Sequence, residues 1–421
     1  MKRYPSRSTR TLFYSLAGTA GFFTALFVII DAIAVNSITG STSYTFFTGL
    51  AGFVTAVCIL ATLTFCKVRR YGRKVPLGLV VDPAFRNRLF LPRTAMSYVA
   101  IASVFNTFSA VIYFAAAAVF DPTIMLPLMQ FVIIYLVLTE SIIDRDSPSL
   151  VEVQSLLMVA LGAFLATIKP GELDLLLFCL VLGPLNLFTA LSIYFQKKAK
   201  AYISTSGEKV DSIRLRFWMA CGLAIGLIIA SLPFLDVDEV VQTFIPGFLL
   251  SSLSMTLAFA AYVCYIRALG MGKMYVVEAV SSSKIVFTIP ISILTAFLLP
   301  DLLQIDTIDA IFWLIKIIGI VLVSFGVIAL ALAEVRQYLF IVVAPGKDKE
   351  VMDALFNIKG VTSVAAVAGD LDIIAKVRVR TIGKALSNII TKVEQIQGVL
   401  TLQTALVLKE KERFGRGGAY D

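Results

Sequence analysis

The chain has 421 residues, of which 58% are hydrophobic and 15% are charged, and its mean hydropathy is +0.88. Soluble domains carry about 25% charged residues, so this composition excludes a typical soluble protein and indicates a membrane protein. The formal net charge of +9 agrees with basic cytoplasmic loops and does not require a nucleic acid partner.

Several function classes lack their sequence signatures. The chain contains no histidine, and its five cysteines stand singly, without metal-ligand spacing, so we expect no metal site. It also lacks a nucleophile–base motif and a glycine-rich phosphate loop. We therefore expect neither an enzyme nor a bound cofactor.

Apolar runs recur along the first 335 residues. A helix of about 20 apolar residues crosses the hydrocarbon layer of a bilayer. The runs are continuous rather than alternating, which predicts helices and not the strands of a barrel. We predict ten membrane helices in a domain spanning 1–335, at about 11–35, 42–65, 95–120, 123–143, 150–168, 173–195, 213–234, 242–268, 274–299 and 307–334.

Basic residues fall almost entirely in the loops on one side of this arrangement. The loops on the other side hold a single basic residue, Lys169, and two of them are acidic. Because lysine and arginine stay on the cytoplasmic side, we expect both termini in the cytoplasm and the chain in the cell membrane of a prokaryote. The basic linker 67–93 is expected to lie on the lipid surface.

Two helix–turn–helix units, around Ala117 and around Ala268, resemble each other. Each is followed by an acidic or proline-bearing loop and by a last helix with a late glycine, Gly162 or Gly326. This pattern predicts two repeats of five helices, and an odd number per repeat places them inverted in the membrane. Inverted repeats are typical of alternating-access transporters, which bind substrate between the halves. The repeats span about 11–168 and 173–334.

The ninth predicted helix carries five polar side chains within Glu278–Lys284, followed by Pro290. A charged residue inside the hydrocarbon layer costs about 2.5–3.5 kcal/mol on insertion scales and usually faces a bundle interior or a water-filled path. The cluster therefore predicts a substrate pathway; the alternative is that Lys284 is neutralised by a packed neighbour and only holds helices together. With polar residues of other predicted spans, the predicted pathway residues are Lys284, Glu278, Ser281, Gln130, Asn186, Asn106, Tyr262 and Asp31.

Two polar residues need a separate interpretation. Asn186 follows Gly183-Pro184, and a broken helix there would free backbone groups for a ligand. Glu140 lies near the cytoplasmic end of its helix and is expected to be solvated. In the absence of histidine, any proton coupling would have to use carboxylates such as Asp31, Glu140 or Glu278.

Short motifs near the ends of the two repeats carry a family resemblance. They are Glu140, Pro148-Ser-Leu-Val-Glu-Val-Gln154 and Leu161-Gly162 in the first repeat, and Arg267-Ala-Leu-Gly270, Pro290, Ile318-Gly319 and Phe325-Gly326 in the second. With the topology, they resemble the EamA-type carriers of the drug/metabolite transporter superfamily over about 11–334. The resemblance implies a carrier of amino acids, nucleotide sugars, drugs or other metabolites, and a magnesium-transporter branch shares the architecture. The charged residues Glu278, Lys284 and Lys316 do not map onto a family site, and Lys316, in a peripheral last helix, is expected at a helix interface or reaching the surface.

The pattern changes at Arg336, where β-rich and helical segments alternate. We predict strands at 337–344, 361–368, 371–379 and 399–408, and helices at 347–358 and 381–396. The resulting order, βαββαβ, is that of a ferredoxin-like α+β domain. This domain spans 336–409, and residues 410–421 are expected to form a flexible tail.

Three short segments of this domain, Gly360-Val361, Val367-Ala-Gly-Asp-Leu-Asp372 and Gly398-Val399, together with Thr404-Ala-Leu-Val-Leu408, carry a second resemblance. They resemble the ligand-binding half of Lrp/AsnC-type amino-acid-responsive regulators, although Leu402 stands where the family has threonine. Membrane helices occupy the place of the family's DNA-reading module, so we expect no nucleic acid. The effector-binding residues that the resemblance implies are Gly369, Asp370, Asp372 and Thr404. The alternative is that these residues only form a turn and a dimer interface.

Together these observations predict a homodimeric membrane transporter, most simply an exporter, of amino acids or similar small metabolites. A cytoplasmic domain would regulate it by binding an amino acid as effector. The alternatives are a membrane amino-acid receptor that transports nothing, and a divalent-cation transporter of the same superfamily.

Overall fold

The computed structural model describes residues 7–70, 73–86, 88–120, 122–143, 150–168, 175–203, 207, 209–298, 310–332, 335–358, 361–369, 371–379 and 384–406. The chain divides into two compact units. One is a helical unit, Arg7–Glu140 with Gln154–Ala331, and the other contains the C-terminal sheet.

The helical unit follows the predicted apolar segments. Its longer elements are α1 (Arg7–Ser37), α2 (Ser41–Phe65), α4 (Arg93–Ala117), α5 (Pro122–Met129), α6 (Val132–Ile143), α7 (Leu150–Ala166), α8 (Leu175–Leu180), the π-helical turn η1 (Val181–Leu185), α9 (Asn186–Ala201), α10 (Ser212–Ser231), the 3₁₀ turn η2 (Leu232–Phe234), α11 (Val237–Leu269), α12 (Met274–Ser281), α13 (Ser283–Leu298) and α14 (Ala310–Leu332).

Eight helical segments within the described residues are long and apolar enough to cross a membrane. The two others among the ten predicted segments contain shorter apolar helices, Val153–Ala166 and Trp313–Ala329, which belong to α7 and α14. These lengths and compositions are the features of a multi-pass membrane protein.

Three of the predicted segments are broken inside the helical unit. Pro184 lies within η1, where a proline lacks the N–H that an α-helix requires. The segment 122–143 breaks between α5 and α6 at Gln130, and the segment 274–298 breaks between α12 and α13 at Ser282. The Ser282 hydroxyl donates a hydrogen bond to Gln130 Oε1. The two breaks, one from each predicted repeat, are therefore joined directly.

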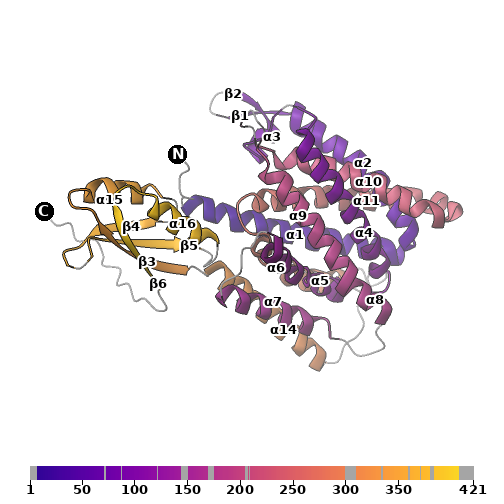
Figure 1. Cartoon of the computed structure of the whole chain (residues 1–421). Coiled ribbons are helices and arrows are strands. Elements are labelled where there is room, and N and C mark those ends of the chain that lie inside the picture. The colour runs from indigo at the N-terminus through magenta and orange to yellow at the C-terminus, as the bar shows by residue number, and fades with distance from the viewer. Residues whose placement is uncertain are drawn as a thin grey trace. The chain divides into compact units, whose positions relative to one another are not determined.

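The last helices of the predicted repeats, α7 and α14, pack with their backbones in contact (Figure 1). A Cβ atom on Gly162 would lie 2.6 Å from the Gly319 carbonyl oxygen, and one on Gly319 would lie 2.6 Å from the Gly162 carbonyl oxygen. Gly326, which follows Gly319 in α14, contacts Ser155 and Val159, which precede Gly162 in α7. The two helices therefore run antiparallel. Small residues permit this close approach of membrane helices.

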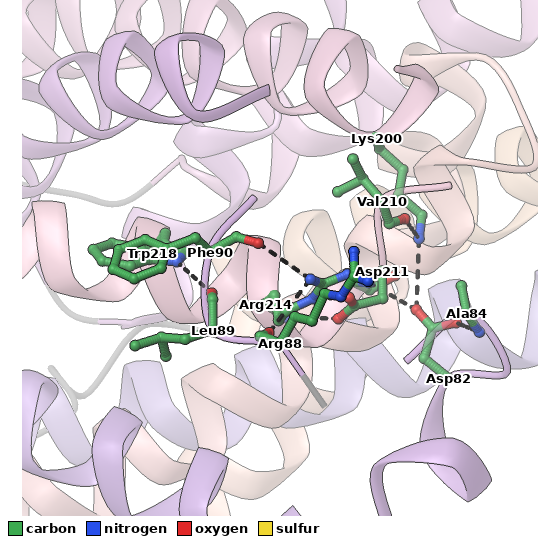
Figure 2. A network of polar contacts seen from close by, with 11 residues as sticks. Asp82, Ala84, Arg88, Leu89, Phe90, Lys200, Val210, Asp211, Arg214 and Trp218 are labelled. Atoms are coloured by element: carbon green, nitrogen blue, oxygen red, sulfur yellow. Dashed lines mark hydrogen bonds and ion pairs between the residues drawn. The ribbon is translucent and has the colours of Figure 1, made fainter. Parts of the chain in front are cut away.

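The linker between α2 and α4 is folded. It contains an antiparallel hairpin of β1 (Lys67–Arg70) and β2 (Arg73–Pro76), followed by the short helix α3 (Leu77–Val81). The buried carboxylate of Asp82 then accepts hydrogen bonds from the backbone N–H of Ser212 at 2.7 Å and of Ala84 at 3.0 Å, and it lies 3.5 Å from Lys200 Nζ (Figure 2). Burial raises the pKa of Asp82, but Lys200 and the backbone donors outweigh burial and hold that pKa below its usual value.

The same network fixes the beginning of α10. Asp211 caps this helix by accepting from the backbone N–H of Arg214, and it forms an ion pair with the Arg214 side chain. Burial raises the pKa of Asp211, and Arg214 offsets only part of this effect. Arg214 Nη1 also donates to the carbonyl oxygens of Arg88 and Phe90, at 3.3 and 3.2 Å (Figure 2). The end of the linker is thus attached to α10.

The C-terminal unit contains a four-stranded antiparallel sheet and two helices. Its elements are β3 (Val335–Val343), α15 (Asp348–Phe356), β4 (Val361–Ala366), β5 (Ile373–Val379), α16 (Lys384–Glu394) and β6 (Val399–Leu406). The strand order is β4-β5-β3-β6. The element order is the predicted strand–helix–strand–strand–helix–strand.

Alternation along β3 places the core of this unit on one face of the sheet. Leu339 and Ile341 are fully buried, as expected for every second residue of a strand. They share one apolar cluster with Leu355 of α15 and with Val393 of α16. Both helices therefore cover the same face.

Candidate functional site

A cavity of about 130 Å³ lies within the helical unit. Its lining comes from α1, α2, α4, α5, α6, α9, α10, α11, α12 and α13, and so from both predicted repeats. An apolar cavity of about 150 Å³ accommodates benzene, so this space suits a small molecule. Unlike such an apolar cavity, it is lined by four charged residues, which are Asp31, Arg216, Glu278 and Lys284.

Glu278 and Lys284 form a buried ion pair on the cavity wall. Lys284 Nζ lies 2.9 Å from Glu278 Oε1, and the Tyr265 hydroxyl donates to Glu278 Oε2 at 2.7 Å. The two charged residues lie on either side of the helix break at Ser282. From sequence, Lys284 either faces a substrate pathway or is neutralised by a packed neighbour. The structure shows both features, because Lys284 lines the cavity and is paired with Glu278.

Asp31 of α1 lies on the cavity wall and is held by hydroxyl groups from three other helices. Tyr44 and Ser254 donate to Asp31 Oδ1 at 2.7 and 2.5 Å, and Tyr113 donates to Oδ2 at 3.1 Å. Asp31 is buried, with 1% of its surface exposed. The three hydroxyl donors favour the charged carboxylate, whereas its burial favours the neutral form.

Arg216 of α10 is a cavity residue that the sequence-based prediction missed. Its guanidinium Cζ lies 4.3 Å from the centroid of the Tyr262 ring, within the range of a cation–π contact. Only 3% of Arg216 is exposed. From sequence it counts among the cytoplasmic basic residues, because it stands in the first turns of the predicted helix 213–234. The available signal was the Arg-Leu-Arg spacing, because residues two apart point to different sides of a helix.

Six of the eight predicted pathway residues line the cavity, namely Lys284, Glu278, Ser281, Asn106, Tyr262 and Asp31. Gln130 and Asn186 do not line it. Gln130 accepts from Ser282 and joins the two helix breaks. Asn186 Nδ2 donates to the carbonyl oxygens of Val181 and Leu128, at 2.7 and 3.1 Å. The break at Pro184 does free backbone groups, but the Asn186 side chain satisfies them.

Glu140 is not solvated, contrary to the expectation from its position near a helix end. It is 2% exposed, forms an ion pair with Lys197 of α9, and accepts from the backbone N–H of Met274 at 2.9 Å. A carboxylate at this position stabilises the N-terminus of α12. Lys316 is fully buried and donates to Thr123 at 2.7 Å, which places it at a helix interface.

The effector residues implied for the C-terminal unit are separated by the sheet. Asp372 Oδ2 accepts from the backbone N–H of Val343 at 2.7 Å, at the end of β3. Gly369 has a φ of +148° in the turn before β5, a conformation that favours glycine. Thr404 is exposed on β6, paired with Leu339 on the opposite edge of β3. Asp370 lies outside the described residues.

Comparison with known proteins identifies one part of the chain. Residues 338–415 match the family model of the Lrp/AsnC ligand binding domain. No curated protein matches the chain. A solved structure titled "Crystal structure of protein" is 13% identical, with a TM-score of 0.46, and the match covers 74% of this chain and 97% of that one. The chain thus joins an Lrp/AsnC ligand-binding domain to a helical unit with the features of a multi-pass membrane protein.

Proposed function

We propose that this protein is a membrane carrier of an amino acid or a similar small metabolite, regulated through its C-terminal domain. The observation that carries the proposal is the charged cavity among apolar helices. Buried charges are costly in a membrane protein and mark substrate paths when they face a shared cavity. Both predicted repeats contribute to this cavity, as expected of a carrier built from inverted halves.

Further support comes from the helix breaks. The breaks at Gln130 and Ser282 occur in corresponding helices of the two predicted repeats and contact each other. Discontinuous helices near the repeat interface are typical of transporter sites. Ten membrane spans, with α7 and α14 as the shorter pair, and the architecture of the drug/metabolite transporter superfamily are part of this proposal.

The regulatory part of the proposal concerns the Lrp/AsnC ligand-binding domain. A ferredoxin-like fold for this domain is part of the proposal and agrees with its strand–helix–strand–strand–helix–strand order. Two such domains would pair in a homodimer. An amino acid bound there would change transport only if its affinity differed between the inward-facing and outward-facing states. A difference of about 5–150-fold corresponds to about 1–3 kcal/mol of coupling.

Uptake of a labelled amino-acid panel into proteoliposomes tests the carrier. We expect the full chain to accumulate at least one compound and the variant Lys284→Met to lose that uptake. Asp236→Asn is a matched control, because Asp236 caps α11 outside the cavity. A folded full chain that transports none of the panel would overturn the amino-acid carrier.

A receptor that transports nothing is the second candidate, favoured by the ligand-binding domain. It predicts amino-acid binding by the full chain with no uptake. The divalent-cation alternative is disfavoured because the wall carries two cationic and two anionic residues, so the cavity offers a divalent cation no net negative charge.

A further inference from the structure

Arg216 is a buried cation that has no anionic partner among the residues described by the structure. Its Nε has no hydrogen-bond acceptor, and no ion pair involving Arg216 occurs in the part of the chain that the structure describes. Arg214, two residues earlier on the same helix, pairs with Asp211 and two carbonyl groups. The difference is informative, because a buried guanidinium normally needs such partners.

The guanidinium group of Arg216 is placed so that it can bind the carboxylate of a ligand in the cavity. Arg216 Cζ lies over the Tyr262 ring, 4.3 Å from its centroid, and the N–H groups of a guanidinium point outward along the edge of its plane. A carboxylate matches that edge with two parallel hydrogen bonds. Arg216 also lines the cavity, so the missing anion has space beside it.

The charges on the cavity wall restrict the ligand further. Glu278 and Lys284 neutralise each other, which leaves Arg216 and Asp31 as the cavity charges without an ion-pair partner among the described residues. Tyr262 contacts Arg216 through its ring and lines the same cavity as Asp31. A ligand with only a carboxylate would bring a net charge into a water-poor space, whereas a zwitterion would not.

We propose that the cavity binds a small zwitterion, with its carboxylate on Arg216 and its ammonium group on the side of Asp31. This inference deepens the proposed function by giving the substrate class and its anchor, and it rests on the proposed function in treating the cavity as the substrate site. An α-amino acid satisfies the charge pattern, and the cavity volume limits its size. Tyr262 is a positioning residue that holds the guanidinium group against the cavity.

The test uses the purified full chain in detergent and three matched pairs of probes. The pairs are alanine and alaninamide, leucine and leucinamide, and phenylalanine and phenylalaninamide, in which the amide keeps the ammonium group and lacks the carboxylate. Thermal unfolding is measured with each compound and with propionate, which has only the carboxylate. We expect at least one amino acid to raise the melting temperature, and its amide and propionate to fail.

Variants of Arg216 assign the binding to this residue. Arg216→Gln should lower the affinity for the amino acid by roughly 100-fold, as expected when one partner of a buried charged contact is removed. Arg216→Lys retains the positive charge but lacks the planar guanidinium group with its paired N–H donors, so this variant should bind the amino acid only weakly. The C-terminal domain stays intact in both variants and accounts for any stabilisation that survives in Arg216→Gln. An amino acid that stabilises Arg216→Gln as much as the unsubstituted protein would overturn the inference.

The melting temperature without ligand separates a binding role from a structural one. Arg216→Met should raise it, because the variant removes a buried charge that has no anionic partner. A lower melting temperature would indicate a structural role and overturn the inference, as would equal binding of an amino acid and its amide, or no binding by any probe. Arg216-dependent binding without uptake would retain the inference and reject the carrier. Uptake that is unchanged in Arg216→Gln would retain the carrier and reject the inference.

Discussion

Lys284 Nζ lies 2.9 Å from Glu278 Oε1, and the pair spans the break between α12 and α13 at Ser282. A continuous α-helix places residues six apart at about 120° to each other around its axis, since each residue turns by about 100°. The break lets both charges face the same cavity. The pair therefore neutralises two buried charges and fixes the geometry of the broken segment.

We expect Lys284→Met to destabilise the protein by about 3–5 kcal/mol, because it leaves the buried Glu278 carboxylate without its cation. The double variant Glu278→Gln/Lys284→Met should recover most of the melting temperature, since neither charge remains, while uptake stays low. Thermal unfolding in detergent and proteoliposome uptake measure the two effects. Recovery of uptake in the double variant would show that the pair only holds helices together.

The close packing of α7 and α14 gives a stability prediction. Gly162→Ala places a methyl group 2.6 Å from the Gly319 carbonyl oxygen, and overpacking of this kind costs about 1–3 kcal/mol. Gly18 of α1 is the matched control, because a Cβ atom there meets nothing within 4 Å. Gly18→Ala should be neutral or stabilise by up to about 1 kcal/mol. Equal melting temperatures for the two variants would contradict the packing described for α7 and α14.

The Asp82 network predicts a pH dependence of stability. The pKa of Asp82 is lowered in the folded protein, so its contribution is present above the unfolded value of about 3.9 and is lost as the pH falls through the folded value. Asp82→Asn should lower the melting temperature at pH 7, by the equivalent of about 1.5–3 kcal/mol for charge-assisted hydrogen bonds. The difference from the unsubstituted protein should shrink toward pH 3. A difference that is constant over this range would exclude a charged Asp82 as its cause.

The C-terminal domain allows stability and effector binding to be separated. Asp372→Ala removes the acceptor for the Val343 N–H and should lower the stability of the domain by about 1–3 kcal/mol. Thr404→Ala changes an exposed side chain and should leave stability within about 0.5 kcal/mol. Amino-acid binding by the full chain, measured by calorimetry on an Arg216→Gln background, should weaken in Thr404→Ala if Thr404 contacts the effector. Unchanged affinity would remove Thr404 from the effector site.

Much of the helical unit was predictable because apolar length alone defines a segment that crosses a membrane. Segment ends were less predictable. α11 begins at Val237 rather than near residue 242, since Asp236 caps it by accepting from the N–H groups of Asp238 and Glu239. This capping carboxylate was visible in the sequence, but hydropathy gives it no weight.

The cavity was predictable only in part, for a physical reason. Intramembrane charge identified Glu278, Lys284 and Asp31, which line the cavity. Gln130 and Asn186 satisfy neighbouring polar groups instead, and a polar side chain that serves the backbone has the same sequence signal as one that serves a ligand. Arg216 was missed because an arginine near a helix start resembles a loop cation until the packing around it is known.

The contact between Gly162 and Gly319 is reciprocal, since each glycine lies against the carbonyl group of the other in antiparallel helices. A contact in which the same residue type meets itself is the form that two identical subunits make around a two-fold axis. Here that form occurs within one polypeptide. An added methyl group on either glycine would therefore meet the carbonyl group of the other, so the two positions share the same limit on side-chain size.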